Sequence, residues 1–139
     1  MGVLMDTSLI VAHERGLLDL GQLADEQLAH RADEPFCLLV ITESELLHGA
    51  HRAREPVRRA RRTAFVEGVL DAFAVLPIDL PTARVHAELG ADLARSGIPV
   101  GTHDLWIASA AAARGLSLAT LKVGEFRRIP GLVVESWGG

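Results

Sequence analysis

Val3-Leu-Met-Asp6-Thr-Ser-Leu-Ile10 reads as a short apolar strand that passes directly into a helix. Its polar residues, Asp6-Thr-Ser8, are of the types that cap a helix, here one that continues through Val11. The same change occurs further along, where the fully apolar run 36–41 is followed by Thr42-Glu-Ser-Glu45 and a helix to about residue 54. A buried strand followed at once by a helix with a polar start is therefore the recurring local pattern.

The rest of the chain alternates in the same way. Apolar runs predict further strands at 75–78, 116–119 and 132–134, and helical patterns are predicted at 20–31, 56–73, 81–95, 103–114 and 123–127. Strands that are apolar throughout and separated by helices indicate a parallel sheet covered on both faces. We expect an α/β fold, a three-layer α/β/α sandwich with a central parallel sheet of about five strands, formed by a single domain over residues 1–139.

The composition, with 49% hydrophobic and 23% charged residues, is typical of a soluble globular protein. Cys37 is the only cysteine, so no internal disulfide can form, and no Cys/His cluster has zinc-ligand spacing. The first residues lack the basic start of a signal peptide, and no apolar stretch approaches the ~20 residues that span a bilayer. We therefore expect a protein of the reducing cytoplasm, with no membrane partner.

The basic residues are unevenly distributed. The chain has a net charge of −4, which does not favour binding to a polyanion, and its 14 lysine and arginine residues include a single lysine, Lys122. Six arginines fall within one short stretch: Arg52, Arg54, Arg58, Arg59, Arg61 and Arg62. This run is either a solvated helix face or, because the guanidinium fork matches phosphate, a surface that follows a nucleic-acid backbone.

Acidic and polar residues follow the predicted strands. Asp6 comes directly after the first strand, and Glu45 lies in the first helical turn after the second. Asp104 lies in the first turn of the helix entered at residue 102. Behind the fourth strand come Thr120, Lys122 and Glu125. In a parallel sheet these strand-to-helix junctions open on one edge, where ligands bind in such folds, so the sequence predicts an acidic crevice there.

Each acid also has a purely local explanation. Thr42 and Glu45 match a capping box, in which both side chains bond free backbone N–H groups. Asp6 can cap its own helix, and Asp104 in a first turn complements the helix dipole, an effect of ~0.3–1 kcal/mol when exposed. Several carboxylates on one edge, however, repel one another unless a cation neutralises them. Mg²⁺ is the natural occupant, because it takes oxygen ligands and commonly binds one or two carboxylates together with a substrate phosphate.

A magnesium site of this kind supports hydrolysis of a phosphodiester, because the ion polarises the phosphate and activates a water near neutral pH. We expect Asp6, Glu45 and Asp104 to be the metal-binding and catalytic residues. Glu45 would orient or deprotonate the water if it is not itself a ligand. An acidic crevice also fits an inserted Arg or Lys, so an inhibitory partner could block the site with a basic residue.

Five segments carry a family resemblance: LMDTSLI (4–10), VITESELLHG (40–49), GTHDLWIAS (101–109), LATLKVGEF (118–126) and IPGL (129–132). Together they resemble the PIN domain, and most of all the VapC-type toxins of prokaryotic toxin–antitoxin pairs. The resemblance spans essentially the whole chain. It implies a PIN-like sandwich and an endoribonuclease that cuts RNA with Mg²⁺ or Mn²⁺. It also implies a homodimer that a cognate antitoxin holds inactive.

The resemblance assigns residues of this chain to the family's site. Asp6 and Asp104 match the metal-binding aspartates, and Glu45 matches the acid of the T-x-x-E-L segment. Thr7 and Thr120 match polar positions that line the site.

One position departs from the family pattern, because Lys122 stands where the family carries Asn or Asp. Three interpretations are open. Glu125, one helical turn further on, supplies a fourth acid; or Lys122 binds the substrate phosphate or stabilises a leaving group; or its charge partly replaces the metal and cripples the site. We expect retained activity, because the three principal acids are intact.

Two rival functions belong to other classes. The first is a catalytically impaired PIN-like module that acts through RNA or antitoxin binding, and Lys122 and the negative net charge support it. The second is a receiver-like or phosphatase-like α/β domain with an acidic pocket, which the placement of the acids disfavours. Two further residues draw attention: His103 is expected to point to solvent, and Trp106 is expected in the core or in a dimer contact.

Overall fold

The computed structural model describes residues 2–31 and 33–137. In this part of the chain, five strands form one parallel sheet in the order β3-β2-β1-β4-β5. The strands are β1 (Val3–Met5), β2 (Phe36–Leu39), β3 (Ala74–Leu76), β4 (Ser117–Thr120) and β5 (Val134–Ser136). The predicted α/β class and the parallel sheet are confirmed.

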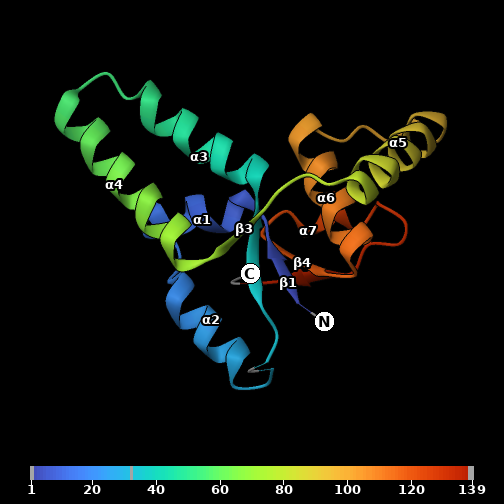
Figure 1. Ribbon diagram of the computed structural model, residues 1–139, viewed down its shortest axis with the longest axis horizontal. Helices are drawn as coiled ribbons and strands as arrows, with labels where there is room; N and C mark the ends of the chain where they lie inside the picture. The colour runs from blue at the N-terminus through green and yellow to red at the C-terminus, as the bar shows by residue number, and fades with distance from the viewer. Residues whose placement is uncertain (1, 32, 138–139) are drawn as a thin grey trace.

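Helices cover both faces of the sheet (Figure 1). They are α1 (Thr7–Glu14), α2 (Leu20–Leu28), α3 (Val40–Arg52), α4 (Pro56–Ala72), α5 (Leu80–Arg95), α6 (Thr102–Arg114) and α7 (Val123–Phe126). Helices α1 to α4 lie on one face and α5 to α7 on the other. None of the helices described is long and apolar enough to cross a membrane.

Alternate residues of each strand build the two cores, because successive side chains of a strand point to opposite faces. Val3 and Met5 of β1 pack with α1 to α4, together with Leu38 of β2. Leu4 packs with α5 to α7, together with Leu118 of β4. All five side chains are fully buried, which explains why the strands read as continuous apolar runs.

Several predicted boundaries differ from the observed ones by one to three residues, among them the end of β2 and the position of β5. The run 36–41 does not stay extended, since α3 already begins at Val40. Strand β5 lies two residues later than predicted, in register with β4 through the pair Leu118 and Val134. Its polar residue Glu135 is held by Arg31, Ser117 and Trp137. These contacts keep a charged side chain in a strand that its sequence alone does not indicate.

The strand order reverses between β1 and β4. The chain runs outward from β1 through β2 to β3 and then returns to place β4 and β5 on the other side of β1. Open α/β sheets bind ligands at the carboxyl ends of the strands at such a switch point. Here the backbone N–H of Asp6 donates to the carbonyl of Ala119 at 2.9 Å, so the residue after β1 is fixed beside the end of β4.

Candidate active site at the carboxyl edge of the sheet

Asp6 is the buried centre of the acidic edge and is fully inaccessible to solvent. Its Oδ2 accepts hydrogen bonds from Ser8 Oγ at 2.7 Å and from Thr120 Oγ1 at 2.8 Å. Its Oδ1 is also buried and finds no hydrogen-bond partner in the described part of the chain. Asp6 stands at the N-cap position of α1, but its carboxylate bonds hydroxyls rather than the helix backbone, so the capping explanation is wrong.

Glu45 reaches the same edge from α3. Thr7 Oγ1 donates to Glu45 Oε1 at 2.9 Å and lies 2.9 Å from the hydroxyl of Thr42, which is fully buried. The predicted capping box is also wrong, because Thr42 lies inside α3, whose N-cap is Leu39. The other oxygen of Glu45, Oε2, is 3.4 Å from His103 Nδ1. The hydrogen bond from Thr7, the first residue of α1, thus holds the carboxylate of Glu45 in α3 in place.

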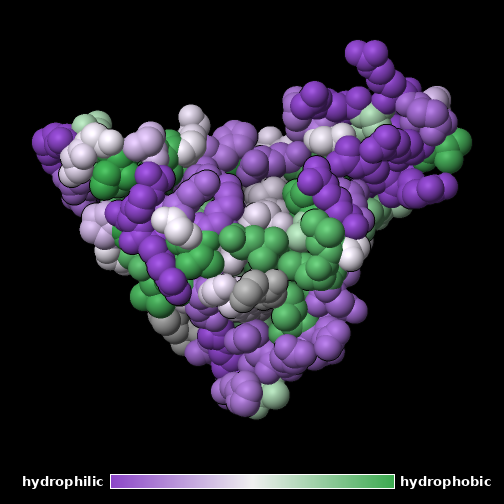
Figure 2. Space-filling model, turned by 180° about the vertical axis from the view of Figure 1, so that it is seen from behind, coloured by the Kyte–Doolittle hydropathy of each residue, from purple (hydrophilic) through white to green (hydrophobic). Residues whose placement is uncertain are grey.

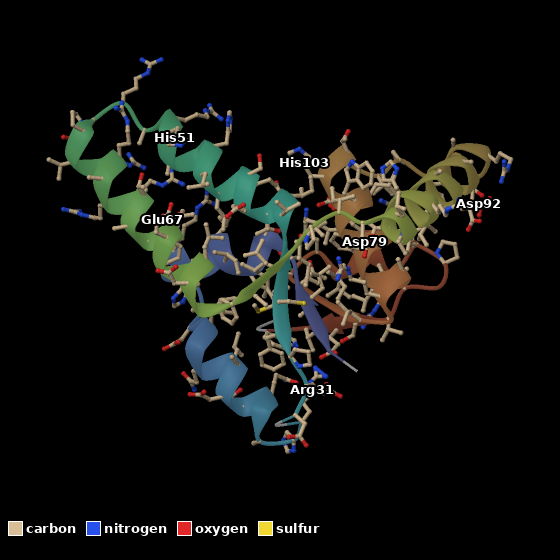
Figure 3. The ribbon with its side chains drawn as sticks, viewed as in Figure 1. Arg31, His51, Glu67, Asp79, Asp92 and His103 are labelled. Carbon is tan, nitrogen blue, oxygen red and sulfur yellow. The ribbon has the colours of Figure 1, made fainter. Side chains whose placement is uncertain are left out.

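His103 lies at the start of α6 and faces α3 (Figure 3). Its side chain is half exposed, as predicted, but its contact with Glu45 makes it part of the site. Trp106 is partly buried against the core and stacks on His86, with the ring centroids 3.6 Å apart. Trp106 therefore packs against the core, which is one of the two positions predicted for it.

Asp104 is paired with Lys122. The ammonium Nζ donates to Oδ1 and Oδ2 of Asp104, both at 2.8 Å, and lies 5.6 Å from the ring centroid of Phe126. Burial by itself lowers the pKa of Lys122, but the hydrogen bond with Asp104 and the charges of Asp6, Asp104 and Glu125 outweigh it and raise that pKa above its usual value. Lys122 is therefore positively charged at neutral pH.

Two open clefts meet at Asp104. One, of about 360 Å³, is lined by Glu45, Gly101, Thr102, His103, Asp104 and Lys122. The other, of about 590 Å³, lies towards α7 and is lined by Pro99, Val100, Gly101, Asp104, Glu125, Phe126 and Arg128. Glu125 lines this second cleft, and its charge acts on Lys122. The clefts provide space for an extended substrate beside the carboxylates.

The structure brings the predicted site residues to this edge, six of them in three bonded pairs and Glu125 on the wall of the second cleft. The pairs are Thr7 with Glu45, Thr120 with Asp6, and Lys122 with Asp104. Ser8 and Thr42 complete the network and were not predicted. Ser8 could have been found, because it stands two residues after Asp6 in the same D-T-S segment; nothing in the sequence shows that Thr42 turns towards Thr7.

The donor set agrees in chemistry with a magnesium site, but not every donor is free. An unpaired, buried carboxylate oxygen such as Asp6 Oδ1 is the kind of atom that a hard cation would satisfy. Both oxygens of Asp104, however, are bonded to Lys122. Within residues 2–31 and 33–137, no three histidine, cysteine, aspartate or glutamate side chains lie close enough together to hold an ion.

A second polar region lies on the α3–α4 hairpin, whose projecting end is mostly hydrophilic (Figure 2). Arginines line two clefts of about 560 and 610 Å³, which share Glu55, Arg58 and Arg62. Two arginines of this hairpin bond its backbone. Arg59 donates to the carbonyl of Ala53 at 2.8 Å, and Arg62 donates to the carbonyl of Gly49 at 2.8 Å.

Comparison with known proteins agrees with this architecture. The PIN domain family model matches residues 3–132. Ribonuclease VapC1 of Rickettsia felis is 37% identical over 134 residues, which cover 96% of this chain and 95% of that protein. The tRNA(fMet)-specific endonuclease VapC of Salmonella typhimurium is 41% identical over 102 residues, or 73% of this chain and 75% of that protein.

A solved structure is similar over nearly the whole length. It is VapBC-5 from Mycobacterium tuberculosis, a member of the VapBC family of toxin–antitoxin systems, with 36% identity and a TM-score of 0.71. The match covers 97% of this chain and 95% of that one. The chain therefore belongs to the PIN domain family, and its similarity to these relatives places it in the VapC branch.

Proposed function

We propose that this chain is a Mg²⁺-dependent endoribonuclease, a hydrolase that acts in the cytoplasm as the toxin of a type II toxin–antitoxin pair. The observation that carries the proposal is the buried carboxylate of Asp6, which lies where the strand order reverses and has one oxygen without a partner among the described residues. Glu45 and Asp104 line the cleft at the same edge. The ribonuclease names of its VapC relatives support RNA as the substrate.

Asp6 and Asp104 are the residues proposed to hold Mg²⁺, or Mn²⁺ in its place, with Glu45 as a further ligand or as the base. An ion bound there would supply polarisation of the scissile phosphate and activation of a water near neutral pH. Ser8 and Thr120 keep Asp6 in one orientation by two hydrogen bonds to Oδ2, which leaves Oδ1 for the ion. Thr7 anchors Oε1 of Glu45, so that Oε2, which lies 3.4 Å from His103 Nδ1, is the oxygen proposed to accept a proton from the attacking water.

Cleavage of RNA by purified variants tests the proposal. Asp6→Asn and Asp104→Asn remove one charge each from the site and keep the side-chain size. We expect both to reduce Mg²⁺-dependent cleavage at least ~100-fold, in the range that loss of a key electrostatic group produces. Asp71→Asn, on the exposed face of α4, is the matched control and should cleave like the wild type. Cleavage that persists unchanged in the first two variants or in EDTA would contradict the proposal.

The proposed partners are RNA, a cognate antitoxin and a second copy of this chain. The similarity to a VapBC toxin–antitoxin structure supports the antitoxin. The cleft beside Glu45 and Asp104 is acidic and open, so a basic side chain of the antitoxin can enter it and displace substrate. Light scattering of the purified chain tests the homodimer, and a mass of one chain, 14.9 kDa, would contradict it.

The second candidate function is an impaired PIN-like module that acts only by binding RNA or antitoxin. The specific observation in its favour is the pairing of Asp104 with Lys122. Calorimetric titration with Mn²⁺ separates the two functions, because the impaired module predicts no heat of metal binding above that of the Asp6→Asn variant.

A further inference from the structure

Lys122 places a positive charge directly on one of the two proposed metal-binding aspartates. Its ammonium bonds both carboxylate oxygens of Asp104, so a metal ion that binds either oxygen would lie beside a positive charge that repels it while the pair is intact. It is the only lysine in a chain that otherwise uses arginine. A compact ammonium fits between a carboxylate and an aromatic ring, whereas a planar guanidinium is larger and less adaptable.

The surrounding residues hold the ammonium in this place. The centroid of the Phe126 ring lies 5.6 Å from the ammonium, at the distance of a cation–π contact, and Phe126 is only 1% exposed. The backbone N–H of Lys122 donates to Thr120 Oγ1 at 2.9 Å, and the same hydroxyl donates to Asp6. The lysine backbone is therefore tied to the buried aspartate, while its side chain reaches the second aspartate.

The side chain can nevertheless leave. Lys122 is 36% exposed and Asp104 is 20% exposed, and both line the open cleft beside Glu45. A long lysine stem can turn from a cleft to solvent by rotation about its side-chain bonds, with no change of backbone. The position at Asp104 therefore has two possible occupants, the internal ammonium or an external cation, and one excludes the other.

We propose that Lys122 is an internal counter-cation that competes with the divalent metal ion for Asp104, so that metal binds fully only when the lysine side chain swings out of the site. This inference rests on the proposed metal-dependent function. It explains why the described acids do not form a ready metal cluster although their chemistry suits one. It also makes the affinity for metal an adjustable property of this site, set by a single residue.

Titration of the full chain with Mn²⁺ tests the competition. Lys122→Met removes the charge but keeps an apolar stem against Phe126. We expect it to bind Mn²⁺ about tenfold more tightly than the wild type, which corresponds to ~1.4 kcal/mol. Arg127→Met is the matched control, because it removes one exposed positive charge from the neighbouring helix turn, and its Mn²⁺ affinity should stay within about twofold of the wild type. In the double variant Asp104→Asn/Lys122→Met the gain should disappear.

The wild type itself provides a second measurement, which does not depend on how the variants fold. Because the chain has one lysine, labelling with ¹³C-lysine gives one Cε resonance that reports on Lys122 alone. Added Mg²⁺ should shift this resonance towards the position of a free lysine, with the same midpoint as calorimetric binding. A resonance that stays unchanged while metal saturates the site would overturn the proposal, as would equal Mn²⁺ affinity in wild type and Lys122→Met.

Failure of this proposal can be distinguished from failure of the proposed function. If Lys122→Met binds Mn²⁺ like the wild type while Asp6→Asn loses both metal binding and RNA cleavage, the metal-dependent nuclease stands and the competition is refuted. If no variant binds Mn²⁺ and RNA cleavage is insensitive to EDTA, both are refuted. Tighter binding by Lys122→Met, together with a metal-dependent lysine resonance, supports both.

Discussion

Replacing Thr120 with Val should destabilise the fold through the active-site network rather than through packing. Thr120 is fully buried, and its hydroxyl donates to Asp6 Oδ2 at 2.8 Å while it accepts the Lys122 N–H at 2.9 Å. Valine has nearly the same shape but no hydroxyl. The buried carboxylate of Asp6 would keep one donor, Ser8, instead of two.

The magnitude follows from the kind of bond that is lost. A hydrogen bond to a charged group contributes about 1.5–3 kcal/mol, and here the acceptor is inaccessible to water, so the upper half of that range applies. For a chain of this length ~2–3 kcal/mol lowers the Tm by roughly 5–10 °C. Thr120→Ser keeps the hydroxyl and loses one buried methyl, which costs about 1 kcal/mol.

Urea unfolding in EDTA, followed by circular dichroism, measures both variants without any effect of bound metal. The free energy of unfolding should decrease more for Thr120→Val than for Thr120→Ser, with unchanged m-values. A Thr120→Val variant within ~0.5 kcal/mol of the wild type, or a reversed order of the two variants, would refute the claim that this hydroxyl holds the buried carboxylate.

Two other predictions concern regions outside the acidic edge. The double variant Arg58→Ala/Arg61→Ala should weaken binding of single-stranded RNA. The slope of log K against log[salt] should become shallower by about 1.4, as expected when two phosphate contacts are lost. An unchanged slope would show that these arginines only face solvent. Burial raises the pKa of the Cys37 thiol to about 11 from 9.0, so stability should fall as pH rises through 9–11, where the unfolded thiol ionises first, and a cysteine-free variant should lack this component. Ellman's reagent at pH 8 should label Cys37 only on unfolding, and rapid labelling of the native protein would contradict its burial.

The α/β class could be predicted because β1, β2 and β4 are buried on both faces and therefore read as uninterrupted apolar runs. The position of β5 could not, because Glu135 is kept in the strand by Arg31, a residue more than 100 positions earlier in the chain. Arg31 lies far from His103 in Figure 3, at the opposite end of the molecule from the acidic edge. The apolar pattern around β5 cannot reveal a contact between residues so far apart in the sequence.

The acids could be assigned to one edge because parallel topology brings Asp6 and Glu45 to the carboxyl ends of β1 and β2. Asp104 reaches the same edge from the start of α6, the helix that leads into β4. Their bonding partners could not be assigned. The capping motif at Thr42 was misleading, since its hydroxyl meets Thr7 rather than the helix backbone. The direction in which Lys122 extends depends on how α7 packs beside α6, which only the folded chain determines.

The fate of oxygen during RNA cleavage tests the central claim most directly. If Asp6 and its neighbours direct a water at the phosphodiester, single-turnover cleavage in H₂¹⁸O should place one ¹⁸O in the terminal phosphate of the product, as mass spectrometry would show. The reaction should require Mg²⁺ or Mn²⁺ and should vanish in Asp6→Asn. Products that end in a 2′,3′-cyclic phosphate without ¹⁸O would contradict the account, because they would show that the RNA 2′-hydroxyl, not water, attacks the phosphorus.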